Sequence, residues 1–211
     1  MFDFVAKNRA QIVTLTAEHV SLVGAAMLIA IMVGVPLGIL ITRWESFRKP
    51  VLGSVNIIQT IPSLALFGFL LPLPWLGSRA ERLAVAALAA YALLPIVRNT
   101  YTGILGIDPA VREAAIGMGL NPRQLLWRVE LPLTAPFIFS GIRIATVTAI
   151  GVATIAAAVG AGGLGEFIFR GVAMVNNQLI LAGAVPAAAL ALVADLVLGV
   201  VERRLRHPRA Q

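Results

Sequence analysis

Four long stretches of this chain contain no charged side chain, and they limit the possible folds more than any other feature. They cover residues 20–42, 51–78, 144–165 and 171–194, and a shorter uncharged stretch covers residues 83–97. About 20 helical residues cross the roughly 30 Å hydrocarbon core of a bilayer, and arginines at both ends of the short stretch can extend to the interfaces. Only 13% of the residues are charged, too few for the surface of a water-soluble chain. The sequence therefore predicts an all-α, polytopic membrane protein with about five transmembrane helices.

We expect one transmembrane domain with a short extension at each end. Residues 1–18 mix apolar and polar side chains at loose helical spacing, which predicts an outer interfacial helix. Residues 19–201 form the membrane domain, and residues 202–211 form a basic cytoplasmic tail. A polar segment over 105–132 precedes the fourth span, and residues 161–178 form an outer connection. The predicted spans are 19–42, 51–74, 81–98, 133–160 and 178–201.

The placement of positive charge predicts the orientation of these spans. Most of the 17 Lys and Arg residues fall after the first span, between the third and fourth spans, and in the tail. Lys and Arg favour cytoplasmic loops, so we expect the N-terminus outside and the C-terminus inside. The net charge of +7 then reflects topology. We expect contact with membrane lipid and no nucleic-acid partner.

Residues that hold metals, cofactors or nucleotides are scarce in this sequence. Cysteine is absent, which excludes disulfides and thiolate metal sites. The two histidines, His19 and His207, lie far apart in the sequence, and no G-x-x-x-x-G-K-[ST] phosphate loop occurs. We therefore expect no catalytic, metal or cofactor site in this chain, and no ATP hydrolysis by it alone.

The segment 105–132 carries helix signals of its own. Asp108 followed by Pro109 is a favourable N-cap and first-turn pair, and Gly119 is suited to the left-handed conformation that ends a helix. Asn121 and Pro122 predict the start of a second short helix, before Leu131-Pro132 closes the segment. The pattern alone leaves open whether this is a specialised unit or an ordinary amphipathic loop.

A motif in this segment resembles the EAA loop of ABC-importer permeases. Glu113-Ala114-Ala115 is followed at the family's spacing by Gly119, by Val129 where the family prefers Ile, and by Leu131-Pro132. In such permeases a short helix docks into a cleft of a separate ATPase. The resemblance implies pairing of Glu113 with a basic group and charge offered to the partner by nearby arginines. The implied ATPase-coupling residues are Arg112, Glu113, Ala114, Ala115, Gly119, Val129, Leu131 and Pro132.

A wider resemblance extends from about Glu18 to Arg204. Residues 54–65, 94–103 and 160–168 are similar to permeases of importers for quaternary-amine osmoprotectants such as glycine betaine, choline and carnitine. The resemblance implies a bacterial cytoplasmic (inner) membrane location and a separate ATPase that binds ATP-Mg. It also implies a second permease copy or a homologous permease, and an extracytoplasmic substrate-binding protein. Alternatives are a methionine-type or other small-solute importer, an ion-coupled secondary transporter, and a non-transporting membrane subunit.

Polar residues inside the spans are candidates for the translocation path. Asn56, Gln59, Thr60 and Ser63 lie at i, i+3, i+4 and i+7, on one helix face. Polar groups are costly in lipid, so this face should point inward, and Pro62 loosens the helix there. A structural polar seam between spans is the alternative. The candidate path residues are Asn56, Gln59, Thr60, Pro62, Ser63, Thr146 and Thr154.

Two further features have competing interpretations. Gly162, Gly163 and Gly165 predict an outer mouth, or alternatively close helix packing. Asp195 lies at membrane depth, where an ionisable group is a functional candidate, but an ion pair with Arg143 would be structural. A quaternary ammonium is usually bound by an aromatic cage. The few Trp and Tyr residues suit membrane interfaces instead, so we expect selection by the external binding protein.

Overall fold

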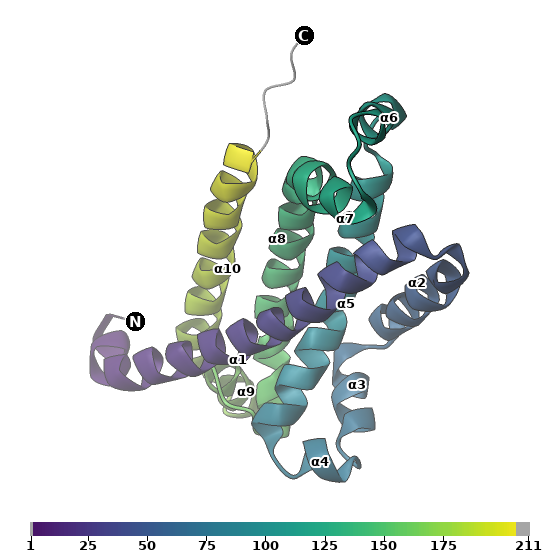
Figure 1. Cartoon of the computed structure of the whole chain (residues 1–211). Coiled ribbons are helices and arrows are strands. Elements are labelled where there is room, and N and C mark those ends of the chain that lie inside the picture. Colours follow the sequence, from purple (N-terminus) through teal and green to yellow (C-terminus); the bar gives the residue numbers. More distant parts are fainter. Residues whose placement is uncertain (1, 206–211) are drawn as a thin grey trace.

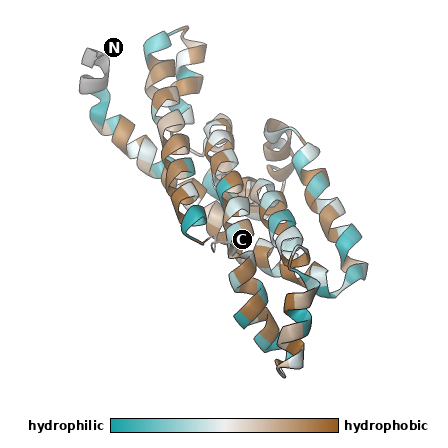
Figure 2. Ribbon diagram, turned by 90° about the horizontal axis from the view of Figure 1, so that it is seen from above, coloured by the Kyte–Doolittle hydropathy of each residue, from teal (hydrophilic) through white to brown (hydrophobic). Residues whose placement is uncertain are grey.

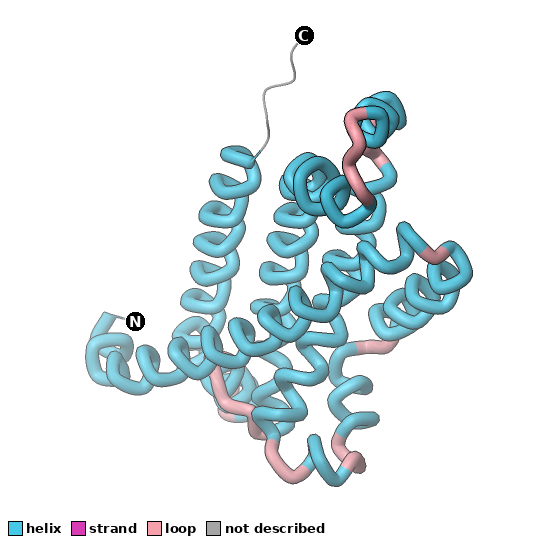
Figure 3. Tube along the Cα trace, in the orientation of Figure 1, coloured by secondary structure: helices cyan, strands magenta, loops and turns pink. Residues whose placement is uncertain are grey.

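The computed structural model describes the backbone of residues 2–205 and the side chains of residues 8–205. In this part of the chain, helices are joined by short loops and no strand occurs (Figure 3). The elements, labelled in Figure 1, are α1 (Phe2–Arg43), α2 (Glu45–Thr60), α3 (Ser63–Leu70), α4 (Pro74–Gly77), α5 (Ala80–Leu105), α6 (Pro109–Gly117), α7 (Pro122–Leu125), η1 (Leu126–Glu130), α8 (Leu131–Ala156), η2 (Ala157–Val159), α9 (Gly165–Ala173) and α10 (Asn177–Leu205).

The prediction of an all-α fold with about five spans is confirmed. Among the described residues, four helical stretches are long and apolar enough to cross a membrane: α1, α5, the stretch 122–159, and α10. The pair α2 and α3 passes the same test together, although its two helices are bent by 105°. Apolar residues cover much of the length of the long helices (Figure 2). Many large apolar side chains of these helices are exposed, among them Leu28, Leu192 and Leu196, which suits a hydrocarbon solvent.

The span expected over 51–74 is broken by a bend between α2 and α3, at the proline expected to loosen it. Pro62 lacks a backbone N–H and disfavours helical conformation in the residue before it, and Ile61 is extended, with φ −72° and ψ 127°. The carbonyl freed at Ile61 accepts a hydrogen bond from the Tyr91 hydroxyl. The Gln59 amide donates to the backbone oxygen of Tyr91 at 3.0 Å. The break is thus satisfied by protein groups, as membrane depth requires.

Three other boundaries differ from the sequence expectation at the ends of spans. No break separates residues 2–18 from the first span, because α1 is one helix of 42 residues; the side chains of residues 1–7 lie outside the described part. The third span continues past its expected end at residue 98 to Leu105, since Arg98 is itself a good helix former. Residues 202–205 form the last turn of α10, and residues 206–211 of the expected tail lie outside the described residues.

The fourth span begins earlier than expected, because α7, η1 and α8 form one helical stretch over 122–159. Leu131-Pro132 does not close the preceding segment; Pro132 lies in the first turn of α8. A proline ring clashes with the carbonyl four residues earlier and cannot donate to it. The wider π-type turn over Leu126–Glu130 accommodates this defect, as such bulges commonly do.

Glycines allow α1, α5 and α8 to approach closely at the centre of the bundle. A Cβ added at Gly38 of α1 would lie 2.5 Å from the Cβ of Thr100 on α5. A Cβ at Gly141 of α8 would lie 2.8 Å from the Cβ of Asn99, the neighbouring residue of α5. Small residues at such crossings are typical of helix packing in membranes.

Different helices lie at the two ends of the bundle. In Figure 1, α6, α7 and the C-terminal end of α10 lie toward the upper end, whereas α4 and α9 lie at the opposite end. Arg43, the last residue of α1, contacts η1 and therefore also belongs to the α6 end. The segments expected on the cytoplasmic side thus gather at one end of the molecule.

Candidate functional site

The helix α6 is terminated by groups that the sequence supplies locally. The Asp108 carboxylate accepts a hydrogen bond from the Ala110 N–H at 2.9 Å, with Pro109 in the first turn. At the other end, Leu120 N–H donates to the Ala115 oxygen at 3.2 Å and Gly119 N–H donates to the Ile116 oxygen at 2.9 Å. This pair of bonds is a Schellman motif, and Gly119 supplies its left-handed residue with φ +84°.

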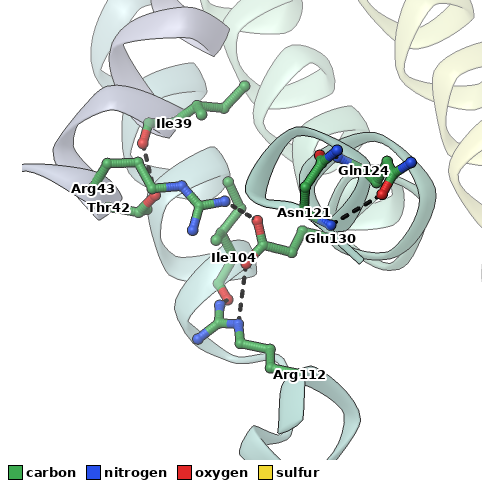
Figure 4. A network of polar contacts seen from close by, with 8 residues as sticks. All are labelled: Ile39, Thr42, Arg43, Ile104, Arg112, Asn121, Gln124 and Glu130. Carbon is green, nitrogen blue, oxygen red and sulfur yellow. Dashed lines mark hydrogen bonds and ion pairs between the residues drawn. The ribbon is translucent and has the colours of Figure 1, made fainter. Parts of the chain in front are cut away.

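The turn after Gly119 leads directly into the membrane helix. Asn121 accepts from the Gln124 N–H at 2.9 Å, and the Gln124 side chain accepts from the Asn121 N–H at 3.0 Å. This capping box starts α7 (Figure 4), and α7 continues through η1 into α8. A force applied at α6 or α7 therefore acts directly on the start of a membrane-spanning helix.

The surface of α6 has the character of a docking surface. Ala115 is the buried member of its nine residues, and α6 makes few contacts with the rest of the bundle. Ile116, Met118 and Trp127 are 57%, 75% and 71% exposed, beside the exposed arginine Arg123. Apolar and aromatic groups with nearby arginines are enriched in protein interfaces.

The side chains of Glu113 and Arg112 do not make the contacts that the motif led us to expect. Glu113 is exposed and forms no ion pair among the side chains of residues 8–205, so its expected pairing is not made within this part of the chain. Arg112 does not point out to a partner. Its Nε lies 3.1 Å from the Oε1 of Glu130, and its Nη2 donates to the Ile104 carbonyl at the end of α5.

Glu130 is the residue of this candidate site that the sequence reasoning missed. Its side chain is fully buried, and its second oxygen pairs with Arg43 at the end of α1 (Figure 4). The sequence did contain a signal for this residue, a carboxylate between the motif positions Val129 and Leu131. A charge next to apolar residues at a membrane boundary needs a partner. The remaining motif positions, Val129 and Leu131, are half-buried, and Pro132 is exposed.

A second candidate site lies at the bend between α2 and α3. Four of the expected path residues, Gln59, Thr60, Pro62 and Ser63, line a cavity of about 460 Å³ together with Tyr91 and Thr148. Asn56, Thr146 and Thr154 are not part of its wall. The hydroxyl groups of Thr146 and Thr154 donate to carbonyls of their own helix, at 2.8 and 2.7 Å.

The glycine-rich loop before α9 combines both interpretations given for it. Gly162 and Gly163 have φ of +81° and +78°. Gly162 lines a cavity of about 940 Å³, whereas Gly163 donates to Glu18 on α1 at 3.1 Å and packs against His19. Gly165 is buried where α9 approaches Thr154 of α8. The loop thus borders a cavity and also packs tightly.

The ionisable residue at membrane depth is paired. Asp195 on α10 accepts two hydrogen bonds from Arg143 on α8, at 2.7 and 2.8 Å. Glu202, two turns further along the same face of α10, lies 3.4 Å from the same guanidinium. A Cβ at Gly199 would lie 3.1 Å from that guanidinium, so the glycine leaves room for it. This geometry favours the structural interpretation of Asp195.

Comparison with known proteins agrees with this architecture. Residues 34–207 match the family described as "Binding-protein-dependent transport system inner membrane component". The chain is 43% identical to the choline transport system permease protein OpuBB of Bacillus subtilis (strain 168), over 96% of this chain and 92% of that protein. It is 44% identical to the osmoprotectant import permease protein OsmW of Salmonella typhimurium, over 92% of each.

Solved structures share the fold at lower sequence identity. An inward-facing structure of the MetNI methionine ABC transporter matches with a TM-score of 0.83 and 23% identity, over 93% of this chain and 96% of that one. A bacterial alginate ABC transporter matches with a TM-score of 0.69 and 18% identity, over 92% and 78%. The chain belongs to the binding-protein-dependent transport system inner membrane component family, and it is a membrane translocation subunit of the ABC-importer type, not an enzyme.

Proposed function

We propose that this chain forms the translocation path of an ATP-driven importer for a quaternary-amine osmoprotectant such as glycine betaine, choline or carnitine. The observation that carries the proposal is similarity along nearly the whole chain. Relatives named as choline, glycine betaine/carnitine/choline and osmoprotectant permeases are 41–44% identical to it over at least 92% of its length. The segments 54–65, 94–103 and 160–168 carry the same resemblance.

The chain works with three kinds of partner in this proposal. A separate ATPase, which binds ATP-Mg, docks on α6 and α7, where exposed apolar groups and Arg123 support an interface. A second permease copy or a homologous permease completes the path, and an extracytoplasmic binding protein delivers the solute. The α6 end of the bundle faces the cytoplasm and the N-terminus lies outside, as the distribution of Lys and Arg indicates.

Uptake of labelled solutes tests the substrate class. The complete importer, reconstituted with its ATPase and binding protein, is expected to accumulate labelled choline, glycine betaine or carnitine when ATP is supplied. Labelled methionine serves as the control, because the fold is shared with a methionine transporter. Accumulation of methionine in place of the quaternary amines, or uptake that does not need ATP, would overturn the proposal.

The cavity at the α2–α3 bend is proposed as part of the solute path. Gln59, Thr60 and Ser63 supply polar atoms to its wall, and the helix break beside it supplies a flexible point, a feature of transport routes. Tyr91 is the aromatic residue of the wall, and one ring does not form a cage. The cavity therefore suits passage of a solute better than tight binding, which supports selection by the external protein.

Substitution of Gln59 by glutamate is expected to change the initial uptake rate severalfold. The new carboxylate would lie beside the backbone oxygen of Tyr91, which now accepts from the Gln59 amide at 3.0 Å, and would add a charge to the cavity wall. The same change at Gln178, an exposed residue at the start of α10, is the control. Uptake is measured on assembled importer. A normal rate in Gln59→Glu would favour the polar-seam interpretation.

A further inference from the structure

The Glu130 carboxylate joins four elements at the α6 end of the bundle. It belongs to η1, directly before α8. One oxygen pairs with Arg43 at the end of α1, and the other lies 3.1 Å from the Nε of Arg112 on α6. Arg112 also donates to the Ile104 carbonyl in the last turn of α5. Figure 4 shows the two guanidinium groups on either side of the carboxylate.

Because α6 packs loosely on the bundle, the ion pair between Arg112 and Glu130 makes an important part of the contact between them. One residue of α6, Ala115, is buried, and the helix makes few other contacts outside its neighbour α7. The side chain of Arg112 is only 26% exposed and that of Glu130 is 0% exposed, so solvent screens their attraction weakly. A displacement of α6 reaches α5 directly through residues 106–108 and the Arg112–Ile104 contact, whereas the contacts that link α6 to the end of α1 run through Arg112 and Glu130.

Stability alone does not account for a carboxylate at this place. Burial of an ion pair costs desolvation energy, and apolar residues of similar volume often stabilise a fold equally well. The carboxylate lies between two guanidiniums from different helices, with the Arg43 arm a hydrogen bond and the Arg112 arm an ion pair, so it couples the positions of α1 and α6 electrostatically. Two guanidiniums share one carboxylate here, so release of either arm leaves the other still paired. Such an arrangement holds the elements together while permitting one of them to move.

We propose that Glu130 is a positioning residue that transmits movement of α6 to α1 and α8 through its ion pairs with Arg112 and Arg43. This inference rests on the proposed function, because it requires an ATPase that moves α6. The carboxylate has no part in solute binding or in ATP hydrolysis. Its role is to hold α6 and the two membrane helices α1 and α8 in fixed positions relative to one another during transport.

The test measures solute uptake per ATP hydrolysed in the reconstituted importer. Glu130→Gln removes the charge with little change of shape, and it is expected to lower this ratio about tenfold while the ATPase subunits still co-purify and basal ATP hydrolysis persists. Glu130→Asp, which keeps the charge, is expected to recover part of the ratio. Glu45→Gln is the matched control, because Glu45 is an 89% exposed carboxylate at the same end of the bundle.

Each outcome separates the inference from the function on which it rests. An unchanged ratio in assembled Glu130→Gln importer would overturn the inference, whether both activities stay normal or fall in proportion. Arg43→Gln is the second variant if Glu130→Gln fails to assemble, since it leaves the carboxylate paired with Arg112; it too must lower the ratio, and an unchanged ratio overturns the inference. Failure of the unaltered importer to bind an ATPase would instead contradict the proposed function.

Discussion

Replacement of Asp195 by asparagine is expected to reduce the amount of folded protein in the membrane severalfold. Asp195 accepts two hydrogen bonds from Arg143, and both side chains belong to spans where an unpaired charge is expensive. In the variant, the asparagine oxygen still accepts a hydrogen bond from Arg143 but carries no charge, which leaves the more distant Glu202, at 3.4 Å, as the charged partner. Loss of one partner of such a pair is more damaging than loss of both, because it leaves a charge without compensation.

The double variant Arg143→Gln with Asp195→Asn provides the control for this prediction. It removes both charges of the pair, so it is expected to recover much of the folded protein that Asp195→Asn loses. The fraction of monodisperse protein after detergent extraction measures the effect. If Asp195→Asn alone proves harmless, or if the double variant is as damaged as the single one, the pair does not stabilise the contact between α8 and α10. Asp195 would then regain its place as a functional candidate.

Substitution of Gly119 by alanine is expected to reduce uptake and stimulated ATP hydrolysis about tenfold. Gly119 has φ +84°, and nothing lies within 4 Å of an added Cβ, so the substitution acts on the backbone and not through a clash. A left-handed conformation costs a residue with a Cβ about 1–2 kcal/mol, which corresponds to a factor of roughly 5–30 in the population of the turn. The helix α6 would then present its surface in the wrong direction.

Gly117→Ala is the matched control for this substitution. Gly117 lies two residues earlier, also with open space around it, but within the helix α6, where alanine is favourable. It is expected to retain uptake and stimulated hydrolysis, with both measured on the reconstituted importer. Equal losses in the two variants would point to contact with the partner surface, whereas normal activity in Gly119→Ala would remove the turn from the coupling mechanism.

The sequence predicted those parts of the fold that depend on local signals. Runs without charge located the spans, and Asp108, Gly119 and Asn121 act in caps as their residue types suggest. Span boundaries were less predictable, because a helix continues wherever nothing stops it. Arg98 does not interrupt α5, whereas Pro62 breaks a span that composition alone presents as continuous.

The candidate sites were only partly predictable from helix faces. Gln59 and Ser63 do line one cavity, but they lie on different helices on either side of the bend, so the break at Pro62 and not a shared helix face brings them together. The stripe through Thr146 and Thr154 does not join them, because contacts between helices depend on rotation that a single sequence does not contain. Glu130 was missed for the same reason, since both of its partners lie far away in the chain, at Arg43 and Arg112.

The central claim is that α6 and α7 face the cytoplasm and bind an ATPase, and one labelling measurement tests it most directly. The chain contains no cysteine, so Met118→Cys introduces a single thiol at a site that is 75% exposed. In inside-out vesicles, a membrane-impermeant maleimide is expected to label this thiol when the ATPase is absent and to label it much less when the ATPase is bound. Labelling from the outer side of intact cells, or labelling that the ATPase does not reduce, would contradict the account.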